Sequence, residues 1–206
     1  RTLTAVNARS RNATAECAYG VVTRPTHTNT SWDAAMFEAA AHRFLDLSEP
    51  DFGVALLNDA KYGHSVRENV LGLSLLRSPV YPDPLADEGE QTFTYALMPH
   101  SGPWHDGGVR EEADDLNQPL LVRPVTGLEA GVFLPIKADG VPAALSVLKP
   151  AEEGDGLILR VWEPAGRRGD FGLQLNSGWT VDMPVTILEE PMDVPVRGLK
   201  PFEVKS

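Results

Sequence analysis

Apolar and polar side chains alternate along several short stretches of this chain. The alternating sets are Leu71, Leu73 and Leu75; Phe93, Tyr95 and Leu97; Leu157, Leu159 and Val161; Phe171, Leu173 and Leu175; and Val181, Met183, Val185 and Ile187. A period of two places every second side chain on the same face of an extended chain. Each set therefore predicts a half-buried β-strand, and Ala15 to Val22 is interpreted as a further strand that carries Cys17.

Turn-forming residues separate these stretches. They include Tyr81-Pro82-Asp83-Pro84, Gly107-Gly108, Asp139-Gly140 and Gly154-Asp155-Gly156. Many short strands divided by Gly and Pro are typical of an all-β fold, and we predict an antiparallel β-sandwich with little or no helix. We predict one sheet system over residues 1–120 and a second sheet with the closing strands over 121–206. The interruption between about 124 and 145 separates either two domains or two sheets of one domain.

The segment from Asp33 to Leu47 fits two structures. Ala34, Phe37, Ala41 and Phe44 recur at helical spacing, and Asp33 would suit the N-cap of a helix. The same stretch also alternates as a strand would. The residues alone slightly favour the helix.

Composition and charge exclude several classes of partner. The chain has 206 residues, 18 Lys and Arg against 29 Asp and Glu, and a formal net charge of −11. This charge repels a phosphate backbone and an anionic lipid surface, so we expect neither nucleic acid nor membrane as a partner. The longest apolar run is too short to span a bilayer. Cys17 is the single cysteine, which excludes an internal disulfide and favours a cytoplasmic setting.

The residues give little support for a catalytic centre within the chain. His100, His105 and Asp106 form the densest group of metal-binding types, but they lie in a segment that resembles a loop, where histidines are usually solvated. Acid pairs such as Glu111-Glu112 and Asp114-Asp115 are interpreted as solvated turn residues rather than as a glycosidase pair. We therefore predict no catalytic residue and no metal ligand here.

Two polar clusters are better candidates for binding. Arg24 to Asp33 is rich in hydrogen-bonding side chains around Trp32, which suits either a sugar face or a buried polar loop, and the loop is favoured. The second cluster follows the apolar run that begins at Val54 and presents Asn58, Asp59, Lys61 and Tyr62 before Gly63. Such a turn offers donors and acceptors to a ligand, or is an ordinary solvated hairpin.

Several long motifs in this order resemble one family. They are R-P-T-H-x-N-T-S-W-D over 24–33, G-V-A-L-L-N-D-x-K-Y-G over 53–63, L-S-L-L-R-x-P over 73–79 and F-T-Y-A-L-x-P-H over 93–100. Together they resemble the C-terminal half of glycoside hydrolase family 38, in its cytosolic and bacterial α-mannosidase branch. The resemblance is dense from 19 to 120 and thinner beyond. It favours a strand over Phe37 to Leu47.

The resemblance implies an accessory role in a larger enzyme. Family members are retaining α-mannosidases whose N-terminal barrel and helical domain supply zinc, a nucleophile and an acid/base, and those segments are expected outside this chain. The chain alone is then expected to be inactive and without a metal. By the same resemblance, Asn58 and Asp59 would fix a turn at the rim of the sugar cleft, with Lys61 and Tyr62 directed at mannoside hydroxyls.

Two further expectations concern the chain on its own. If its barrel-facing surface is apolar, the isolated chain is expected to self-associate as a homo-oligomer. The alternative function is a stand-alone carbohydrate-binding or structural β-sandwich module. Such a module needs an exposed aromatic platform, for which Trp32, Trp104, Trp162 and Trp179 are the candidates.

Overall fold

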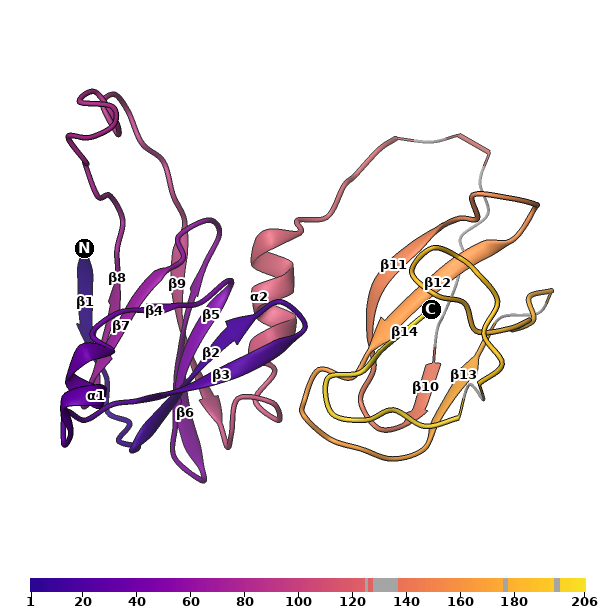
Figure 1. The fold of residues 1–206 in the computed structure, drawn as a ribbon, viewed down its shortest axis with the longest axis horizontal. Coiled ribbons are helices and arrows are strands. Elements are labelled where there is room, and N and C mark those ends of the chain that lie inside the picture. Colours follow the sequence, from indigo (N-terminus) through magenta and orange to yellow (C-terminus); the bar gives the residue numbers. More distant parts are fainter. Residues whose placement is uncertain (125, 128–136, 176–177, 195–196) are drawn as a thin grey trace. The chain divides into compact units, whose positions relative to one another are not determined.

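The chain folds into two compact units, Arg1–Val122 and Arg123–Ser206 (Figure 1). The computed structural model describes residues 1–124, 126–127, 137–175, 178–194 and 197–206. Part of the interruption predicted between 124 and 145 therefore lies outside the described residues. None of the helices among those described is long and apolar enough to cross a membrane.

The first unit consists of two antiparallel sheets. One has the strand order β1-β8-β7-β4 and the other the order β3-β2-β5-β6-β9. The strands are β1 (Thr2–Ala5), β2 (Asn12–Cys17), β3 (Gly20–Pro25), β4 (Ala39–Ala40), β5 (Phe44–Ser48), β6 (Phe52–Asn58), β7 (Gly63–Arg67), β8 (Val70–Leu73) and β9 (Tyr95–Ser101). Leu45 and Leu56 from one sheet pack with Leu71 and Leu73 from the other in a buried cluster. The predicted antiparallel sandwich is thus confirmed.

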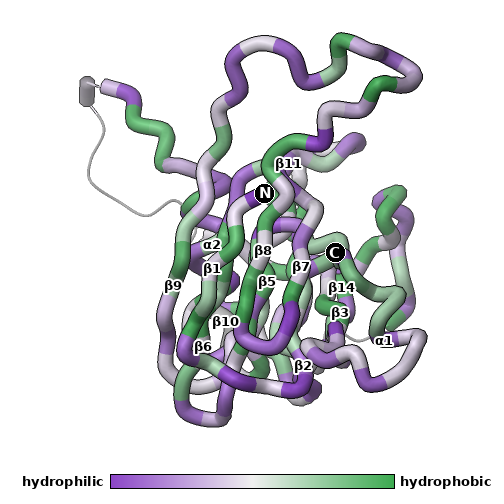
Figure 2. The backbone as a smooth tube through the Cα atoms, turned by 90° about the vertical axis from the view of Figure 1, so that its left-hand side faces the viewer, coloured by the Kyte–Doolittle hydropathy of each residue, from purple (hydrophilic) through white to green (hydrophobic). Residues whose placement is uncertain are grey.

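A helix covers the other face of the five-stranded sheet. It is α2 (Val109–Asn117), whose Val109 and Ala113 pack on Phe44 and Leu57. Since β5 and β6 are buried on both faces, their residues are apolar almost without interruption, as in β6 from Val54 to Leu57. Figure 2 shows hydrophobic positions along these strands.

The position of α2 corrects the prediction for the acid pairs. Glu111, Glu112, Asp114 and Asp115 lie on this helix, not in a turn. Asp114 is half-buried and pairs with Arg43, the residue just before β5, and with Arg110. Three of these four carboxylates are exposed on the surface of the helix. The fourth, that of Asp114, helps to hold the helix in place through its ion pair with Arg43.

The ambiguous segment from Asp33 to Leu47 contains both kinds of structure. A single helical turn, α1 (Ser31–Ala35), begins after Thr30, and Thr30 and Asp33 form its capping box. Asp33 is therefore the third residue of the helix and not its N-cap. The chain then forms two strands, β4 and β5, with a break between them. The prediction of one continuous strand from Phe37 to Leu47 is therefore wrong, although both ends of the break are strands. The ladders that β5 forms with β2 and β6 outweigh local helix propensity.

Two other strand predictions need correction. Ala15 to Val22 is a hairpin, because β2 ends at Cys17 and Tyr19 takes a left-handed φ of 53° before β3 begins. Val181 to Ile187 forms no named strand, only a bridge between Val185 and Pro191. Pro184 interrupts this stretch and has no N–H to donate to a ladder.

The second unit contains two small antiparallel sheets. β10 (Lys137–Gly140) pairs with β13 (Phe171–Gln174), while β12 (Leu157–Trp162) lies between β11 (Ala144–Pro150) and β14 (Val204–Lys205). Val161, Phe171 and Leu199 form its buried cluster. The strands predicted from the alternating leucines at 157–161 and 171–175 are present, the latter one residue shorter.

Candidate functional site

The turn between β6 and β7, residues 58–63, is held by the side chain of Asn58, which is fully buried. Asn58 Nδ2 donates to the His42 carbonyl at 2.9 Å, and Asn58 Oδ1 accepts from the Lys61 amide at 2.6 Å. A buried amide that satisfies neighbouring backbone groups fixes the local chain path. The Asn58 side chain therefore points into the protein and shapes the turn from below.

The turn also joins the stems of a long excursion of the chain. We call this excursion, residues 74–94 between β8 and β9, the arm (Figure 1). Asp59 Oδ2 accepts from the Thr94 amide at 3.0 Å, and the Asp59 amide donates to the Thr94 carbonyl at 3.2 Å. On the other stem, the Ser74 amide donates to the Gly63 carbonyl at 2.7 Å. The turn and the base of the arm thus form one structure.

Lys61 and Tyr62 each lie beside an aromatic ring. Lys61 is half-buried, with Nζ 5.2 Å from the centre of the Phe93 ring, a cation–π contact. Tyr62 is 61% exposed, and the centre of its ring lies 5.3 Å from the centre of the His42 ring. An ammonium and a phenol at the surface of a braced turn can donate to hydroxyl groups of a polar ligand.

A buried histidine lies under the same turn. His64 Nε2 is 3.4 Å from Asn58 Nδ2, and Nδ1 is 3.3 Å from the Tyr62 carbonyl. Since the amide can only donate, Nε2 accepts and the ring hydrogen sits on Nδ1, facing the Tyr62 carbonyl. Burial lowers the pKa of His64, and the bond to the Tyr62 carbonyl opposes this to a smaller extent. The neutral ring, with its hydrogen on Nδ1, can therefore form a hydrogen bond with each of its two partners.

Sequence reasoning missed the helix that supports this site. Asn117, in the last turn of α2, donates from Nδ2 to the Asn58 carbonyl at 3.0 Å and to the Ala113 carbonyl at 2.8 Å. The available signal was the spacing of Val109, Ala113 and Leu116, which places all three on one side of a helix. α2 therefore extends the site beyond the four predicted residues.

The cluster from Arg24 to Asp33 satisfies much of its own polarity. Thr26 Oγ1 donates to the Ser10 carbonyl at 2.5 Å, and Thr30 Oγ1 lies 2.8 Å from Asp33 Oδ2. Thr26 is the only residue of this cluster that is buried. The favoured interpretation of a buried polar loop is therefore wrong, because the loop is polar but mostly not buried. Trp32 is 81% exposed.

His100 differs from its prediction as a solvated loop residue. It lies in β9 with its side chain buried, and its Nε2 is 2.8 Å from Asp46 Oδ1. This hydrogen bond raises the pKa of His100. A Cβ on Gly53 or Gly107 would lie within 2.5 Å of the ring, so glycines make room for it on both sides. The described residues hold no group of three or more His, Cys, Asp or Glu placed to bind a metal.

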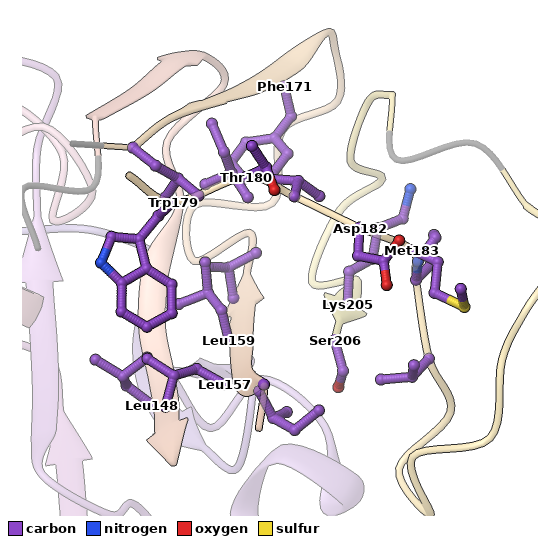
Figure 3. Close-up of a pocket in the computed structure, with 18 residues that line it drawn as sticks. Leu148, Leu157, Leu159, Phe171, Trp179, Thr180, Asp182, Met183, Lys205 and Ser206 are labelled. Carbon is purple, nitrogen blue, oxygen red and sulfur yellow. The ribbon is translucent and has the colours of Figure 1, made fainter. Parts of the chain in front are cut away.

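The second unit contains a separate, mainly apolar cavity of about 230 Å³. Figure 3 shows Leu148, Leu157, Leu159, Phe171 and Trp179 around it, with Asp182 and Lys205 also on its wall. A lining of this composition suits the loosely filled interior of a small sandwich better than a sugar site, which needs several polar groups. The turn at 58–63 remains the better candidate.

Comparison with known proteins identifies relatives of both units. Residues 1–85 match the model of the glycosyl hydrolases family 38 C-terminal domain, and residues 143–206 match that of the family 38 C-terminal beta sandwich domain. Alpha-mannosidase 2C1 of Homo sapiens is 46% identical over 187 residues, which cover 89% of this chain and 18% of the human protein. Alpha-mannosidase G of Dictyostelium discoideum is 41% identical over 79% of this chain and 15% of its own length.

The fold has a counterpart among solved structures. The crystal structure of an alpha-mannosidase from Enterococcus faecalis V583 superposes with a TM-score of 0.81 at 21% identity, over 98% of this chain and 24% of that one. This chain thus spans less than a quarter of each of these three relatives. Two family models in their expected order, the identity to two curated α-mannosidases and the matching fold lead to one conclusion. The chain belongs to glycosyl hydrolase family 38, as part of its C-terminal region.

Proposed function

We propose that this chain is the accessory C-terminal region of an α-mannosidase that hydrolyses terminal α-mannosides with retention of configuration. The observation that carries the proposal is the 46% identity to alpha-mannosidase 2C1 over 89% of the chain. The nucleophile, the acid/base and the zinc site belong to other segments of the same polypeptide. The described residues of this chain gather no donor set that fits zinc. With one cysteine among 206 residues, the protein suits the cytoplasm.

The turn at 58–63 is proposed to border the sugar cleft of the intact enzyme. Asn58 and Asp59 bond to backbone groups and hold the turn, so they act as positioning residues. The half-buried Lys61 and the exposed Tyr62 would bind mannoside hydroxyls. The phenol of Tyr62 can donate or accept, and the ammonium of Lys61 supplies a charged donor.

The proposal is tested with the full-length gene product and a chromogenic α-mannoside. We expect zinc-dependent activity in the wild type. Lys61→Ala should lower kcat/KM roughly 10- to 100-fold, because a charged hydrogen bond to the sugar is lost. Tyr62→Phe, which removes only the hydroxyl, should lower it roughly 3- to 10-fold.

Lys200→Ala is the matched control, since Lys200 is an exposed lysine of the second unit. Wild-type kinetics in both Lys61→Ala and Tyr62→Phe would remove the turn from the sugar cleft. A full-length protein with no mannosidase activity would instead contradict the proposed reaction. The first outcome bears only on the role of the turn, and the second only on the reaction.

A second candidate function rests on Trp32, the most exposed tryptophan among the described residues. An indole face of this kind can stack on a sugar, as carbohydrate-binding modules require. Binding of mannose oligosaccharides by the 206-residue chain, abolished by Trp32→Ala, would favour this function. If the chain does not bind mannose oligosaccharides, only the accessory role is left as a candidate.

A further inference from the structure

The arm, residues 74–94, carries several large apolar side chains that are exposed. Val80 is 81% exposed, Tyr81 85% and Leu85 62%, and we call these three residues the arm tip. In Figure 2 the arm extends beyond the ends of the strands, with hydrophobic positions along it. Single exposed apolar residues are normal, but a cluster at the end of a projecting loop is typical of a binding surface.

The arm has internal hydrogen bonds that define its shape. Asp87 Oδ2 accepts from the amides of Ser78 at 2.7 Å and Arg77 at 3.1 Å, and these two bonds lower the pKa of Asp87. Asp83 Oδ1 accepts from the Leu85 amide at 2.9 Å. Prolines at 79, 82 and 84 fix φ along the same stretch. A segment ordered in this way loses little conformational entropy when it docks.

The base of the arm is the candidate site itself. Thr94 on one stem bonds to Asp59, and Ser74 on the other stem bonds to Gly63. Phe93 also contacts Lys61. Because the turn and both stems are joined, any surface that fixes the arm also fixes the position of Lys61 and Tyr62.

The relatives are much longer than the region that this chain matches. The human relative is matched over only 18% of its length and the Dictyostelium relative over 15%. We propose that the arm tip inserts into an apolar groove on the catalytic part of the same polypeptide and so sets the rim turn against the sugar cleft. Asp83, Glu88 and Glu90 beside the tip favour basic groups at the edge of that groove. This inference rests on the accessory role proposed above.

Photo-crosslinking in the full-length gene product tests the arm directly. A photoreactive phenylalanine analogue replaces Tyr81, and the crosslinked peptides are identified by mass spectrometry after irradiation. The expected result is a crosslink within one polypeptide, between the arm tip and a segment outside residues 1–206. Adding Val80→Asp should lower the crosslink yield severalfold, because a carboxylate is poorly tolerated in an apolar groove. Val80→Leu should keep the yield.

Three outcomes would overturn the inference. A crosslink between two copies would make the arm tip a self-association surface. A crosslink confined to residues 1–206 would mean that the arm folds back on its own region, and the absence of any protein crosslink would mean that the tip is solvated. The readout needs no catalysis, so an inactive protein with the expected crosslink contradicts the proposed reaction alone. An active enzyme without that crosslink contradicts only the arm.

Discussion

Two buried histidines of the first unit lie in opposite electrostatic settings. His100 bonds to the Asp46 carboxylate, which raises its pKa and favours the charged ring. His64 lies between the Asn58 amide and the Tyr62 carbonyl, and burial lowers its pKa. The stability of the first unit should therefore respond to pH in two opposite ways, one from each ring.

We expect His100→Gln to destabilise the first unit more at pH 5.5 than at pH 8.5. A raised pKa means that the folded state holds the proton more tightly than the unfolded chain. The contribution is therefore full below the ordinary pKa of about 6.5 and is lost as pH rises through the raised value. The loss at pH 5.5 should be roughly 1.5–3 kcal/mol, the range for a hydrogen bond to a charged group. Urea unfolding at both pH values measures it.

His64→Gln is the matched control with the opposite sign. Because the pKa of His64 is lowered, the stability associated with its neutral ring is present above about pH 6.5 and declines as pH falls through the lowered value. Its replacement should therefore cost less at pH 5.5 than at pH 8.5. An equal loss at both pH values for the two variants would show that neither charge state contributes.

At the level of single residues, sequence could locate the turn but not its supports. The run from Val54 to Gly63 predicted an apolar strand that enters a polar turn, as the structure shows. Sequence could not identify two distant partners, since Asp46 lies 54 positions from His100 and Asn117 lies 59 from Asn58. Such pairs depend on strand order, which local patterns do not encode.

Among the elements, α2 links the core to the candidate site. Its first turns bury Val109 and Ala113 against the sheet, and its middle is tied to the sheet by the Arg43–Asp114 ion pair. Its last turn places Asn117 on the Asn58 carbonyl. The helix thus packs on the five-stranded sheet and also supports the turn that carries Lys61.

Asn117→Ala should lower the free energy of unfolding of the first unit by about 1 kcal/mol relative to Asp115→Ala. Both changes give similar gains in helix propensity, and Asp115 is exposed on the same helix, so the difference isolates the two bonds of Asn117. Chemical denaturation of both variants supplies the comparison. Equal stabilities would mean that the bond to the Asn58 carbonyl adds nothing.

The elements also show where local patterns are sufficient. Alternation located β8, β9, β12 and β13. In β9 it indicated the wrong face, because Tyr95 and Leu97 are 42% and 43% exposed while Ala96 and Met98 pack on the core. It failed at Val181 to Ile187, where Pro184 prevents a regular ladder, and in α2, where the many acids obscured three apolar positions. The one-turn helix α1 depends on its capping box, which the sequence displays at Thr30 and Asp33 but which the strand prediction overlooked.

At the scale of the whole chain, each unit has its own buried cluster. Leu47 is fully buried in the cluster between the two sheets of the first unit, and Leu199 is 2% exposed in the cluster of the second. A unit with its own core can fold as a unit. Sequence analysis left open whether the boundary near residue 120 separates two domains or two sheets of one domain, and these alternatives can therefore be tested directly.

We expect Leu47→Ala and Leu199→Ala each to destabilise mainly the unit that contains the substitution, by about 2–5 kcal/mol for a fully buried leucine. Hydrogen exchange measured by mass spectrometry assigns the effect, because peptides from β5 and β6 report on the first unit and peptides from β12 on the second. Leu199→Ala should speed exchange in β12 and leave β6 close to wild type, and Leu47→Ala should do the reverse. If either variant speeds exchange equally in both units, the 206 residues unfold as one cooperative domain, which is the alternative of two sheets in one domain.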